Sequence, residues 1–500
     1  MAEPQEEPWL LPDFLGRRAD RSPEALALRA DGRDLSYRQL DALAAIAAGS
    51  LNAAGVRAGD RVAALMRGGL DFAVLLHAAL RLGAAIVPLN TRLTAAELRG
   101  ELADARPRLF VAGGAHGAVG ALLAEELGLR GWQLPEAPDA THPLYRGPAA
   151  EPVAVSPDAV AAIVYTSGTT GPAKGAMLTR RNFFYAAVTS AMGLGALPGD
   201  RWLLCMPLFH VGGLSIMLRS ALFGGAVLAQ DGFEIEAVRR GLEEEGATCV
   251  SLVPVMLERL LQAGVKPPRS LRFALLGGAA APRELLERAL EAGWPVASTY
   301  GLTETASQAA TLAPAEALEH AGSAGRPLFL TEIRIVRDGR IMPPGEHGEI
   351  QVRGPTVTPG YLDRPAEARD LFSEGYLRTG DVGYLDEGGY LYVLDRRDDL
   401  IVSGGENIYP AEVEAALRRH PDVRDAAVYP VADDAWGQVP AAAVVPRDGT
   451  SPSAEDLLRF LRGELAGYKL PREIRFVPEL PRNAGGKLVR RALKPEVSSE

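Results

Sequence analysis

Residues 165–175 form the strongest candidate for chemistry in this sequence. They read YTSGTTGPAKG, with three glycines, four threonine or serine hydroxyls and one lysine in eleven residues. Glycines let backbone N–H groups converge on an anion, hydroxyls donate further hydrogen bonds, and the ammonium of Lys174 adds a positive charge. We therefore predict a phosphate-binding loop. It is not a Walker loop, because Gly171 is followed by Pro172 where the Walker motif has lysine. The residues expected to contact phosphate are Thr166, Ser167, Gly168, Thr169, Thr170, Gly171 and Lys174.

Lysine is scarce in this chain, which draws attention to the places where it occurs. Only five of the 53 basic residues are lysine, and two of these, Lys174 and Lys487, lie in glycine-bearing loops. A compact ammonium can point at one oxygen in a space where a planar guanidinium would clash. We therefore expect a chemical role for both; the alternative for Lys487 is an exposed, flexible side chain, the usual fate of lysine.

The elements that must position these residues follow an alternating pattern. Between residues 61 and 301, short apolar runs typical of strands alternate with helical patterns. This predicts mostly parallel sheets covered by helices on both faces, with ligands at the carboxyl ends of the strands. The expected strands are 61–66, 84–90, 161–167, 248–254, 272–278 and 295–301, and the expected helices are 71–82, 94–104, 234–246 and 281–292.

Two further regions have a different sequence pattern. Residues 333–394 contain short strands between glycine and proline turns, which predicts a small β-rich subdomain. After residue 396 about 100 residues follow with their own helices and strands, which is enough for a separate domain. The predicted fold class is therefore α/β, with a large N-terminal domain at 1–396 and a small α+β C-terminal domain at 397–500.

Composition excludes several classes of protein. The 500 residues are 47% hydrophobic, enough to fill two or more cores, and their net charge of −10 offers no overall field that attracts nucleic acid or an anionic membrane. The uncharged apolar run 202–218 is 17 residues long and too short to span a bilayer. Cys205 and Cys249 lie in apolar runs, as expected for buried thiols in a reducing compartment. The acidic N-terminus lacks the pattern of a secretion signal, so we expect a cytoplasmic protein.

Eight further segments, in register along the chain, resemble the motifs of the adenylate-forming acyl- and aryl-CoA synthetases, and the loop at 165–175 is similar to the signature loop of that family. The resemblance implies that a carboxylate attacks the α-phosphate of ATP to give an acyl-adenylate, from which the coenzyme A thiol then displaces AMP. It implies ATP, Mg²⁺, coenzyme A and a small carboxylic acid as ligands. The eight segments are LSYRQL (35–40), LGAAIVPLN (82–90), MPLFHVGG (206–213), STYGLTET (298–305), GEIQVRGP (348–355), YLRTGD (376–381), RRDDLIVSGGENIYPAEVE (396–414) and PRNAGGKLVR (481–490).

The resemblance also implies roles in the first step. Glu304 would hold magnesium, a cation suited to carboxylate oxygens, and Thr303 would bond the α-phosphate. Lys487 would reach the α-phosphate and the attacking carboxylate together, and Asp381 would accept the ribose hydroxyls. The remaining nucleotide contacts would be Gly277, Gly278 and Ala279 beside adenine, Tyr300 stacked on adenine, and Arg396 at the ribose or a phosphate.

For the second step, the resemblance implies that the C-terminal domain is mobile and swings about a hinge at Asp398. Gly404 and Gly405 would line the channel for pantetheine, because the absence of side chains lets a narrow arm pass. Trp436 would lie against coenzyme A. Asp395 stands where the family usually has glycine, and this departure concerns the local geometry of the hinge.

Segments 209–224, 300–308, 322–329 and 480–488 resemble one subgroup, the 2-succinylbenzoate (o-succinylbenzoate) CoA ligases of menaquinone biosynthesis. The substrate of that subgroup carries a second carboxylate that is not activated, and burying this charge unpaired costs several kcal/mol. We therefore expect Arg219 to meet it; the alternative for Arg219 is a charge on a helix surface. The expected acyl pocket comprises His210, Gly213, Arg219, Ser307 and Gln308.

Two other functions stay open at this point. A general medium-chain acyl- or aryl-CoA synthetase would need an apolar pocket without a buried cation. A noncatalytic nucleotide-binding regulator would be favoured if Lys487 or Glu304 were replaced, and both are present. Acid-dependent pyrophosphate exchange separates an enzyme from a regulator, and a panel of acids separates the substrates. The sequence leaves open whether the chain forms a homo-oligomer.

Overall fold

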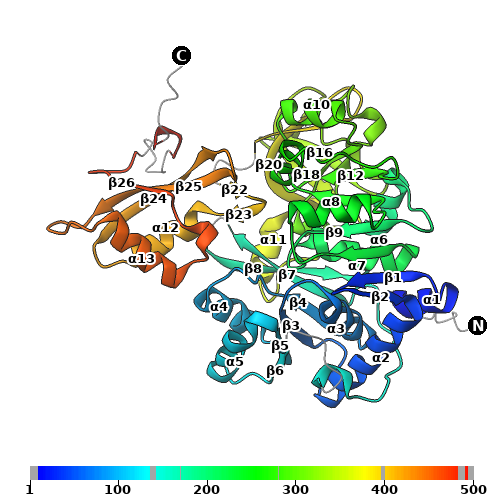
Figure 1. Cartoon of the computed structure of the whole chain (residues 1–500). Helices are drawn as coiled ribbons and strands as arrows, with labels where there is room; N and C mark the ends of the chain where they lie inside the picture. The colour runs from blue at the N-terminus through cyan, green and yellow to red at the C-terminus, as the bar shows by residue number, and fades with distance from the viewer. Residues whose placement is uncertain are drawn as a thin grey trace, which may run out of the picture. The chain divides into compact units, whose positions relative to one another are not determined.

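The computed structural model describes residues 10–135, 142–168, 171–279, 281–395, 400–481 and 490–493 (Figure 1). Packing divides the chain into two compact units. The first contains residues 1–91, 102–165 and 175–394, and the second contains residues 92–101, 166–174 and 395–500. The domain junction predicted between residues 396 and 397 lies outside the described residues and stays a prediction.

A six-stranded sheet, built mainly from the first unit, carries the phosphate-loop motif. Its strands follow the order β6-β5-β3-β4-β7-β8, and neighbours from β6 to β7 are parallel. The apolar runs in β3, β4 and β5 are buried, as expected for a sheet that helices cover on both faces. The strands are β3 Arg61–Leu65, β4 Ala85–Pro88, β5 Leu109–Gly113, β6 Gly131–Leu134, β7 Val160–Gly168 and β8 Gly171–Thr179, and the helices of this region are α2 Tyr37–Ala53, α3 Leu70–Arg81, α4 Ala95–Ala105 and α5 Gly117–Glu126.

A nine-stranded sheet also belongs to the first unit, in the order β15-β14-β13-β12-β11-β9-β10-β1-β2. The strands from β13 to β1 are parallel, and β2, β14 and β15 add antiparallel edges. The strands predicted at 248–254, 272–278 and 295–301 are adjacent here as β11, β12 and β13. The strands are β1 Leu26–Ala30, β2 Arg33–Ser36, β9 Arg201–Leu204, β10 Ala226–Ala229, β11 Cys249–Leu252, β12 Phe273–Leu276, β13 Val296–Tyr300, β14 Ala310–Thr311 and β15 Arg326–Pro327.

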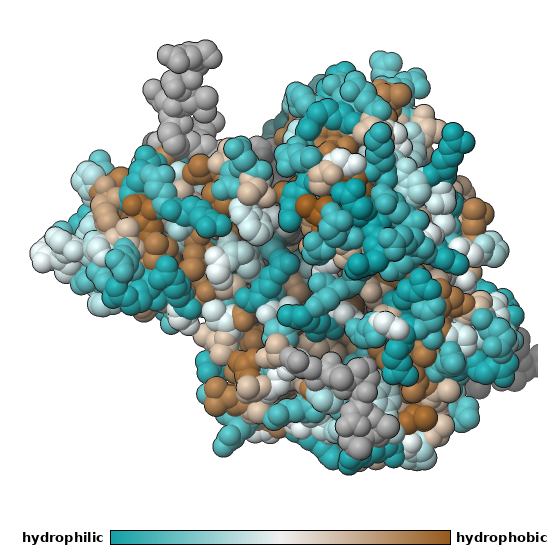
Figure 2. All heavy atoms as spheres, in the orientation of Figure 1, coloured by the Kyte–Doolittle hydropathy of each residue, from teal (hydrophilic) through white to brown (hydrophobic). Residues whose placement is uncertain are grey.

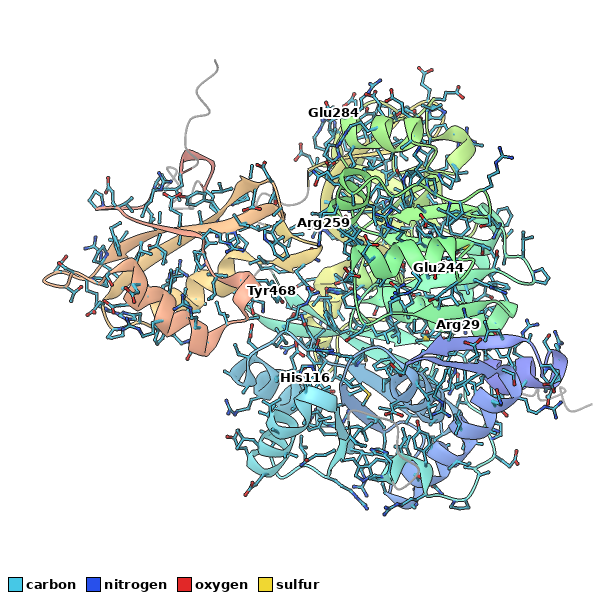
Figure 3. The ribbon with its side chains drawn as sticks, viewed as in Figure 1. Arg29, His116, Glu244, Arg259, Glu284 and Tyr468 are labelled. Carbon is cyan, nitrogen blue, oxygen red and sulfur yellow. The ribbon has the colours of Figure 1, made fainter. Side chains whose placement is uncertain are left out.

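Amphipathic helices accompany the nine-stranded sheet. Charged residues such as Glu244, Arg259 and Glu284 are exposed at the end of α8, in α9 and in α10 (Figure 3), and the face seen in Figure 2 is mostly hydrophilic around α8 and α10. Helix α7 differs, because every residue from 213 to 221 is buried. The helices are α1 Phe14–Arg21, α6 Arg180–Leu194, α7 Val211–Phe223, α8 Ile235–Glu243, α9 Pro254–Gln262 and α10 Arg283–Glu291.

Residues 332–394 of the first unit form the predicted β-rich region. Its strands pair in the order β17-β16-β18-β20-β19, all antiparallel, and β21 also pairs with β20. Its inner face packs Ile335, Ile350, Val352 and Leu391 around Tyr300. The elements are β16 Glu332–Arg337, β17 Arg340–Ile341, β18 Gly348–Arg353, α11 Pro365–Leu371, β19 Phe372–Ser373, β20 Tyr376–Leu385 and β21 Leu391–Asp395.

The C-terminal part of the second unit has the predicted α+β composition. Its sheet follows the order β23-β22-β25-β24, with β26 beside β25. Two helices bury Val413, Leu417, Leu457 and Leu461 in one core with the sheet. The elements are β22 Ile401–Ser403, β23 Glu406–Ile408, α12 Pro410–Arg418, β24 Val423–Asp433, β25 Gly437–Pro446, α13 Ala454–Glu464 and β26 Glu473–Phe476.

A buried lysine for which the sequence offered no role lies in the second unit. Lys469 is 3% exposed, and its Nζ donates to Glu97 Oε1 at 2.6 Å and to Glu412 Oε1 at 2.8 Å. Burial opposes the charge of Lys469, but the surrounding carboxylates, Glu412 foremost, outweigh this effect and raise its pKa. Lys469 is therefore a paired, structural cation.

Both cysteines are free and buried, as predicted. Burial raises the pKa of the Cys205 thiol and of the Cys249 thiol to about 12, so neither forms a thiolate near neutral pH. Within the described part of the chain, no helix combines the length and the apolar character that crossing a membrane requires.

Candidate active site

The phosphate-loop motif lies where β7 turns into β8. The side chains of residues 167–172 are outside the described structure. The contacts predicted for Ser167, Gly168, Thr169, Thr170 and Gly171 therefore stay predictions. Beside them, Thr166 Oγ1 lies 3.5 Å from the backbone oxygen of Lys174. A Cβ on Gly175 would lie 2.7 Å from Cγ2 of Ile163, so the close approach of these strands requires glycine.

Tyr165, the last residue before the loop, is held by an acidic residue that the sequence did not indicate. Its hydroxyl donates to Asp104 Oδ2 at 2.8 Å, and Arg364 Nη2 donates to Asp104 Oδ1 at 3.0 Å. Asp104 thereby links the end of β7 to the segment that follows β18. In the sequence, Asp104 reads as an ordinary solvated acid on a helix, so no signal distinguished it.

Thr303 and Glu304, the residues expected at the α-phosphate and at magnesium, lie in a short 3₁₀ turn, Thr303–Thr305. The chain turns sharply after it, because Ala306 and Ser307 have φ values of 53° and 104°. Such left-handed conformations of residues other than glycine cost about 1–3 kcal/mol and cluster at functional sites. A Cβ on Gly301 would lie 1.6 Å from the oxygen of Ser307, so this turn also requires glycine.

A tyrosine that the sequence analysis missed contacts Glu304. The hydroxyl of Tyr361 donates to Glu304 Oε1 at 2.6 Å. In the sequence, the signal that could have pointed to Tyr361 was its position after Gly360, soon after the motif at 348–355. This signal is weak, because a tyrosine in a loop is more often a packing residue. In the described ranges, no group of three or more His, Cys, Asp or Glu side chains could hold a metal. Glu304 alone still fits Mg²⁺, which is typically held by one or two carboxylates together with substrate phosphates.

The residues expected around the nucleoside gather at the carboxyl ends of β12 and β13. Gly277, Gly278 and Ala279 follow β12, and Tyr300 ends β13, its parallel neighbour. A Cβ on Gly277 would lie 2.8 Å from Cγ2 of Thr299, and Gly278 has φ 80°. The glycines therefore keep this edge free of side chains, as the predicted approach of adenine to the backbone needs.

Tyr300 and Asp381 are in direct contact. The Tyr300 hydroxyl donates to Asp381 Oδ2 at 2.8 Å, and the Asp381 N–H donates to Thr379 Oγ1 at 3.0 Å. Tyr300 and Asp381 are each only 5% exposed, and the tyrosine ring packs in the apolar core of the β-rich region. In this structure Tyr300 positions the Asp381 carboxylate, and its stacking on adenine stays a prediction.

Arg219 is a buried cation and not a charge on a helix surface. It is 5% exposed on α7, where Nη1 donates to Ser190 Oγ at 3.1 Å and Nη2 lies 3.5 Å from Gln308 Oε1. Its guanidinium lies 4.7 Å from the centre of the Trp202 ring, and its Nε has no hydrogen-bond partner among the described residues. Burial lowers the pKa of Arg219 to about 10, as expected for a cation that has no carboxylate partner among the described residues.

Of the residues expected in the acyl pocket, the structure brings Arg219 and Gln308 into contact. Gln308, 1% exposed, reaches Arg219 as described, and it also donates to Thr311 Oγ1 at 3.1 Å. His210 precedes α7, nine residues before Arg219, a separation of about 14 Å along the helix axis and half a turn around it. A Cβ on Gly213 would lie 2.4 Å from the oxygen of Pro207, so Gly213 has a packing role. The roles of His210, Gly213 and Ser307 toward a substrate stay predictions.

Two elements expected at coenzyme A meet in the second unit. Gly404 and Gly405, with φ of 58° and 88°, form the turn between β22 and β23. The Gly404 N–H donates to the Trp436 oxygen at 2.9 Å, and a Cβ on Gly404 would lie 2.5 Å from Cε3 of the indole. Trp436 is 44% exposed, and its backbone N–H donates to Asp433 Oδ1 at 2.9 Å. The exposed indole of Trp436 therefore lies beside a turn that carries no side chains.

Three further predicted residues lie outside the described ranges: Arg396 at the nucleotide, Asp398 at the hinge and Lys487 at the α-phosphate. The side chain of Asp395, the departure from the family pattern, lies outside them as well. Their roles stay predictions.

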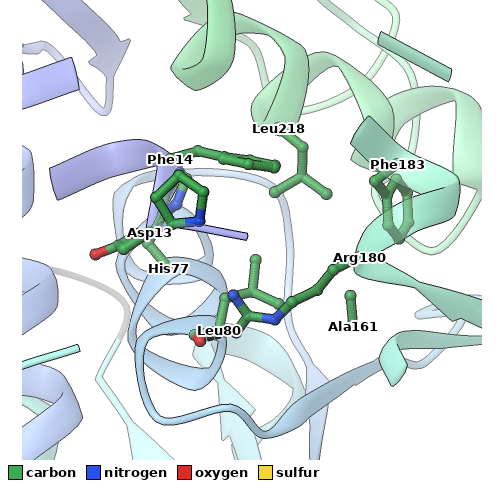
Figure 4. Close-up of a pocket in the computed structure, with 9 residues that line it drawn as sticks. Asp13, Phe14, His77, Leu80, Ala161, Arg180, Phe183 and Leu218 are labelled. Carbon is green, nitrogen blue, oxygen red and sulfur yellow. Dashed lines mark hydrogen bonds between the residues drawn. The ribbon is translucent and has the colours of Figure 1, made fainter. Parts of the chain in front are cut away.

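A small cavity in the first unit contains none of the predicted site residues. Its lining includes Asp13, His77, Arg180 and Phe183 (Figure 4), and its volume of ≈ 20 Å³ is room for about one water molecule. Burial lowers the pKa of His77 to about 4, and burial raises the pKa of Asp13 although Arg81 and Arg180 oppose the rise. A nucleotide or an aromatic acid does not fit there, so this cavity is a feature of the core.

Comparisons with known proteins agree with these observations. The model of the family described as "AMP-binding enzyme" matches residues 15–362, and that of the "AMP-binding enzyme C-terminal domain" matches residues 412–487. The chain is 42% identical over 486 residues to a 2-succinylbenzoate–CoA ligase of Bacillus licheniformis, covering 96% of this chain and 99% of the relative.

Two solved structures of o-succinylbenzoate CoA synthetase (MenE) from Bacillus subtilis, each 40% identical, are also similar. A double mutant bound to the product analogue OSB-NCoA has a TM-score of 0.91 and covers 97% of this chain and 99% of that chain. A complex with ATP and magnesium has a TM-score of 0.74 and covers 97% of this chain and 100% of that chain. These matches confirm the family resemblance and the fold class predicted from the motifs, and the chain belongs to the AMP-binding enzyme family.

Proposed function

We propose that this protein is an ATP-dependent acid–CoA ligase whose substrate is 2-succinylbenzoate, acting in menaquinone biosynthesis. The observation that carries the choice of acid is Arg219, a guanidinium that is buried without an ion pair among the described residues. A fatty acid or a simple benzoic acid would leave this charge without a partner. A second carboxylate on the acid would pair with it and offset the cost of its burial. The named activity of the relatives supports the same choice.

In the first step, one carboxylate oxygen of the acid attacks the α-phosphorus of ATP, the bond to the bridging oxygen breaks, and pyrophosphate leaves. Two anions meet, so the protein must supply positive charge and hydrogen-bond donors where negative charge develops. We assign this task to the loop at 166–174 with Lys174, to Thr303 and to Lys487. Asp381, held by Tyr300, would accept the ribose hydroxyls.

Magnesium would be held by Glu304 and would neutralise phosphate charge when bound. The donor chemistry fits, because a carboxylate has about four acceptor positions and the hydrogen bond from Tyr361 takes only one of them. The carboxylate would thus hold a cation while its orientation stays fixed.

In the second step, the thiol sulfur of coenzyme A attacks the acyl carbonyl carbon, a C–S bond forms, and AMP leaves with the electrons of the C–O bond. We assign the path of the pantetheine arm to the turn at Gly404 and Gly405, and a contact with coenzyme A to Trp436, because the exposed indole lies against this turn. The use of ATP and coenzyme A implies a cytoplasmic enzyme.

A panel of acids tests the proposal. AMP release and loss of the coenzyme A thiol are measured with 2-succinylbenzoate, benzoate and octanoate. We expect both signals with 2-succinylbenzoate at a kcat/KM at least ~10² above that of the other acids, which follows from about 3 kcal/mol of charge pairing. Preference for octanoate or benzoate would replace the proposed substrate by a general acyl or aryl acid. AMP release without thiol loss would remove coenzyme A as the acceptor.

A further inference from the structure

The loop of residues 354–364, between β18 and α11, is hydrogen-bonded along one edge of β8. The Met177 N–H donates to the Gly360 oxygen at 3.0 Å, and the Leu362 N–H donates to the Gly175 oxygen at 2.8 Å. Between these bonds Ala176 and Tyr361 form an antiparallel bridge. The backbone of Tyr361 is therefore fixed in register with the strand that leaves the phosphate loop.

The same loop also holds the turn that carries Glu304. The Thr358 N–H donates to the backbone oxygen of Glu304 at 2.8 Å, and Thr358 Oγ1 donates to the Met177 oxygen at 2.5 Å. Thr358 is 2% exposed, so water does not compete for these bonds. Thr358 therefore ties the backbone of Glu304 to β8, and the Tyr361 hydroxyl holds the carboxylate of the same residue at 2.6 Å.

A third attachment fixes the far end of the loop. Arg364 donates to Asp104, which accepts the hydroxyl of Tyr165 at the end of β7. The loop is thus anchored to both strands that flank the phosphate motif and to the turn at Glu304. These contacts join residues that are far apart in the chain, 57 positions in the case of Tyr361 and Glu304.

From this geometry we infer that Tyr361 is a positioning residue for Glu304: its hydroxyl sets the orientation in which that carboxylate meets a divalent cation. The inference rests on the proposed function, in which Glu304 holds magnesium. A hydrogen bond to an ionised carboxylate is short and strong, and it removes the rotational freedom that the end of a glutamate side chain otherwise has. Removing such a partner of a metal-binding side chain typically costs 10- to 100-fold in metal affinity.

The test compares three variants of the full-length protein. Tyr361→Phe removes only the hydroxyl from Glu304, Glu304→Gln removes the charge itself, and Tyr376→Phe is the matched control. The control loses a hydrogen bond of similar length, 2.7 Å to Glu332 Oε2, at an exposed site. ATP binding is measured by calorimetry over a series of Mg²⁺ concentrations, and thioester formation from supplied acyl-adenylate reports the folded fraction.

ATP binding should tighten as Mg²⁺ is added, and the Mg²⁺ concentration that gives half of this effect should be about 10-fold higher in Tyr361→Phe than in the wild type. The control Tyr376→Phe should be unchanged, and Tyr361→Phe should retain thioester formation. Glu304→Gln should raise that concentration further. If Glu304→Gln shifts the Mg²⁺ dependence and Tyr361→Phe does not, the inference about Tyr361 is wrong while the proposed function stands. If neither variant shifts it, the assignment of Glu304 to magnesium fails and the inference fails with it.

Discussion

Replacing Arg219 with methionine should separate recognition of the acid from stability of the fold. Burial lowers the pKa of Arg219 to about 10 from 12.5, which corresponds to about 3 kcal/mol of unfavourable charge burial at neutral pH. Its contacts with Ser190 and Gln308 are neutral hydrogen bonds, and its Nε has no partner in the described structure. An apolar side chain of similar length removes that cost and leaves no carboxylate unpaired. The free energy of unfolding of Arg219→Met should therefore equal or exceed that of the wild type.

The effect on catalysis should be large and selective. A carboxylate of the substrate that pairs with the guanidinium recovers the cost of burying it, so about 3 kcal/mol is lost when the cation is removed. This corresponds to a fall of about 150-fold in kcat/KM for 2-succinylbenzoate. The acid 3-benzoylpropionate is the same molecule without the ring carboxylate, and we expect its kcat/KM to change by less than about 3-fold. The two acids and two proteins form a double-mutant cycle that isolates the charge pair.

Arg272→Met is the matched control for this experiment. Arg272 also lies over an aromatic ring, Phe273, but it donates to Asp200 Oδ2 at 2.6 Å. Its removal leaves a partly buried carboxylate unpaired, so this variant should lose stability and show no difference between the two acids. Equal losses of kcat/KM for the two acids in Arg219→Met would refute the reasoning. A loss of stability in Arg219→Met like that of the control would refute it as well.

Three other predictions follow from the assigned sites. Lys487→Ala should lower acyl-adenylate formation by about 10³-fold while thioester formation from supplied acyl-adenylate is retained, since a lysine aimed at the α-phosphate acts in the first step alone; parallel losses in both half-reactions would contradict this. Gly404→Ala places a Cβ 2.5 Å from the Trp436 indole and should raise the KM for coenzyme A by about 10-fold without changing pyrophosphate exchange, and an unchanged KM would remove this turn from the coenzyme A path. Burial lowers the pKa of His77 to about 4, so below pH 6.5 the unfolded chain binds a proton that the folded chain excludes. Relative to His77→Leu, the wild type should therefore lose about 1.4 kcal/mol of unfolding free energy per pH unit from 6.5 toward 4 in urea titrations, and parallel pH profiles would show that His77 does not titrate this way.

The alternation of strands and helices could be read from the sequence because burial on both faces of a parallel strand leaves a continuous apolar run. The runs at 248–254, 272–278 and 295–301 became neighbouring strands for this reason. Strand order could not be read in the same way. Strand β1, near the N-terminus, pairs with β10 about 200 residues later, and no local pattern of hydrophobicity identifies a partner at that distance.

The same distinction applies to the candidate site, where local sequence predicted some residues and not others. Residues whose chemical type carries the signal, such as Glu304 and Asp381, could be predicted from motifs. Residues that act by contact with another side chain were missed, because the link between Tyr361 and Glu304 depends on the register of the 354–364 loop against β8. For Arg219 the sequence did hold an unused signal. Residues 214–218, which directly precede the arginine, are almost entirely apolar, and a helix that is apolar on all sides is buried, which argues against a surface position for Arg219.

Two buried cations of this chain show why burial alone does not identify a binding residue. Lys469 is 3% exposed and meets two carboxylates, so its charge is satisfied within the protein and its pKa is raised. Arg219 is 5% exposed and its partners among the described residues are neutral, so burial lowers its pKa without a carboxylate to oppose the effect. A charge that the fold does not pair lowers stability unless an anion supplied from outside recovers the cost. An acidic protein has many carboxylates, yet none of the described ones forms an ion pair with Arg219, and the proposal of a substrate with a second negative charge rests on this feature of the chain.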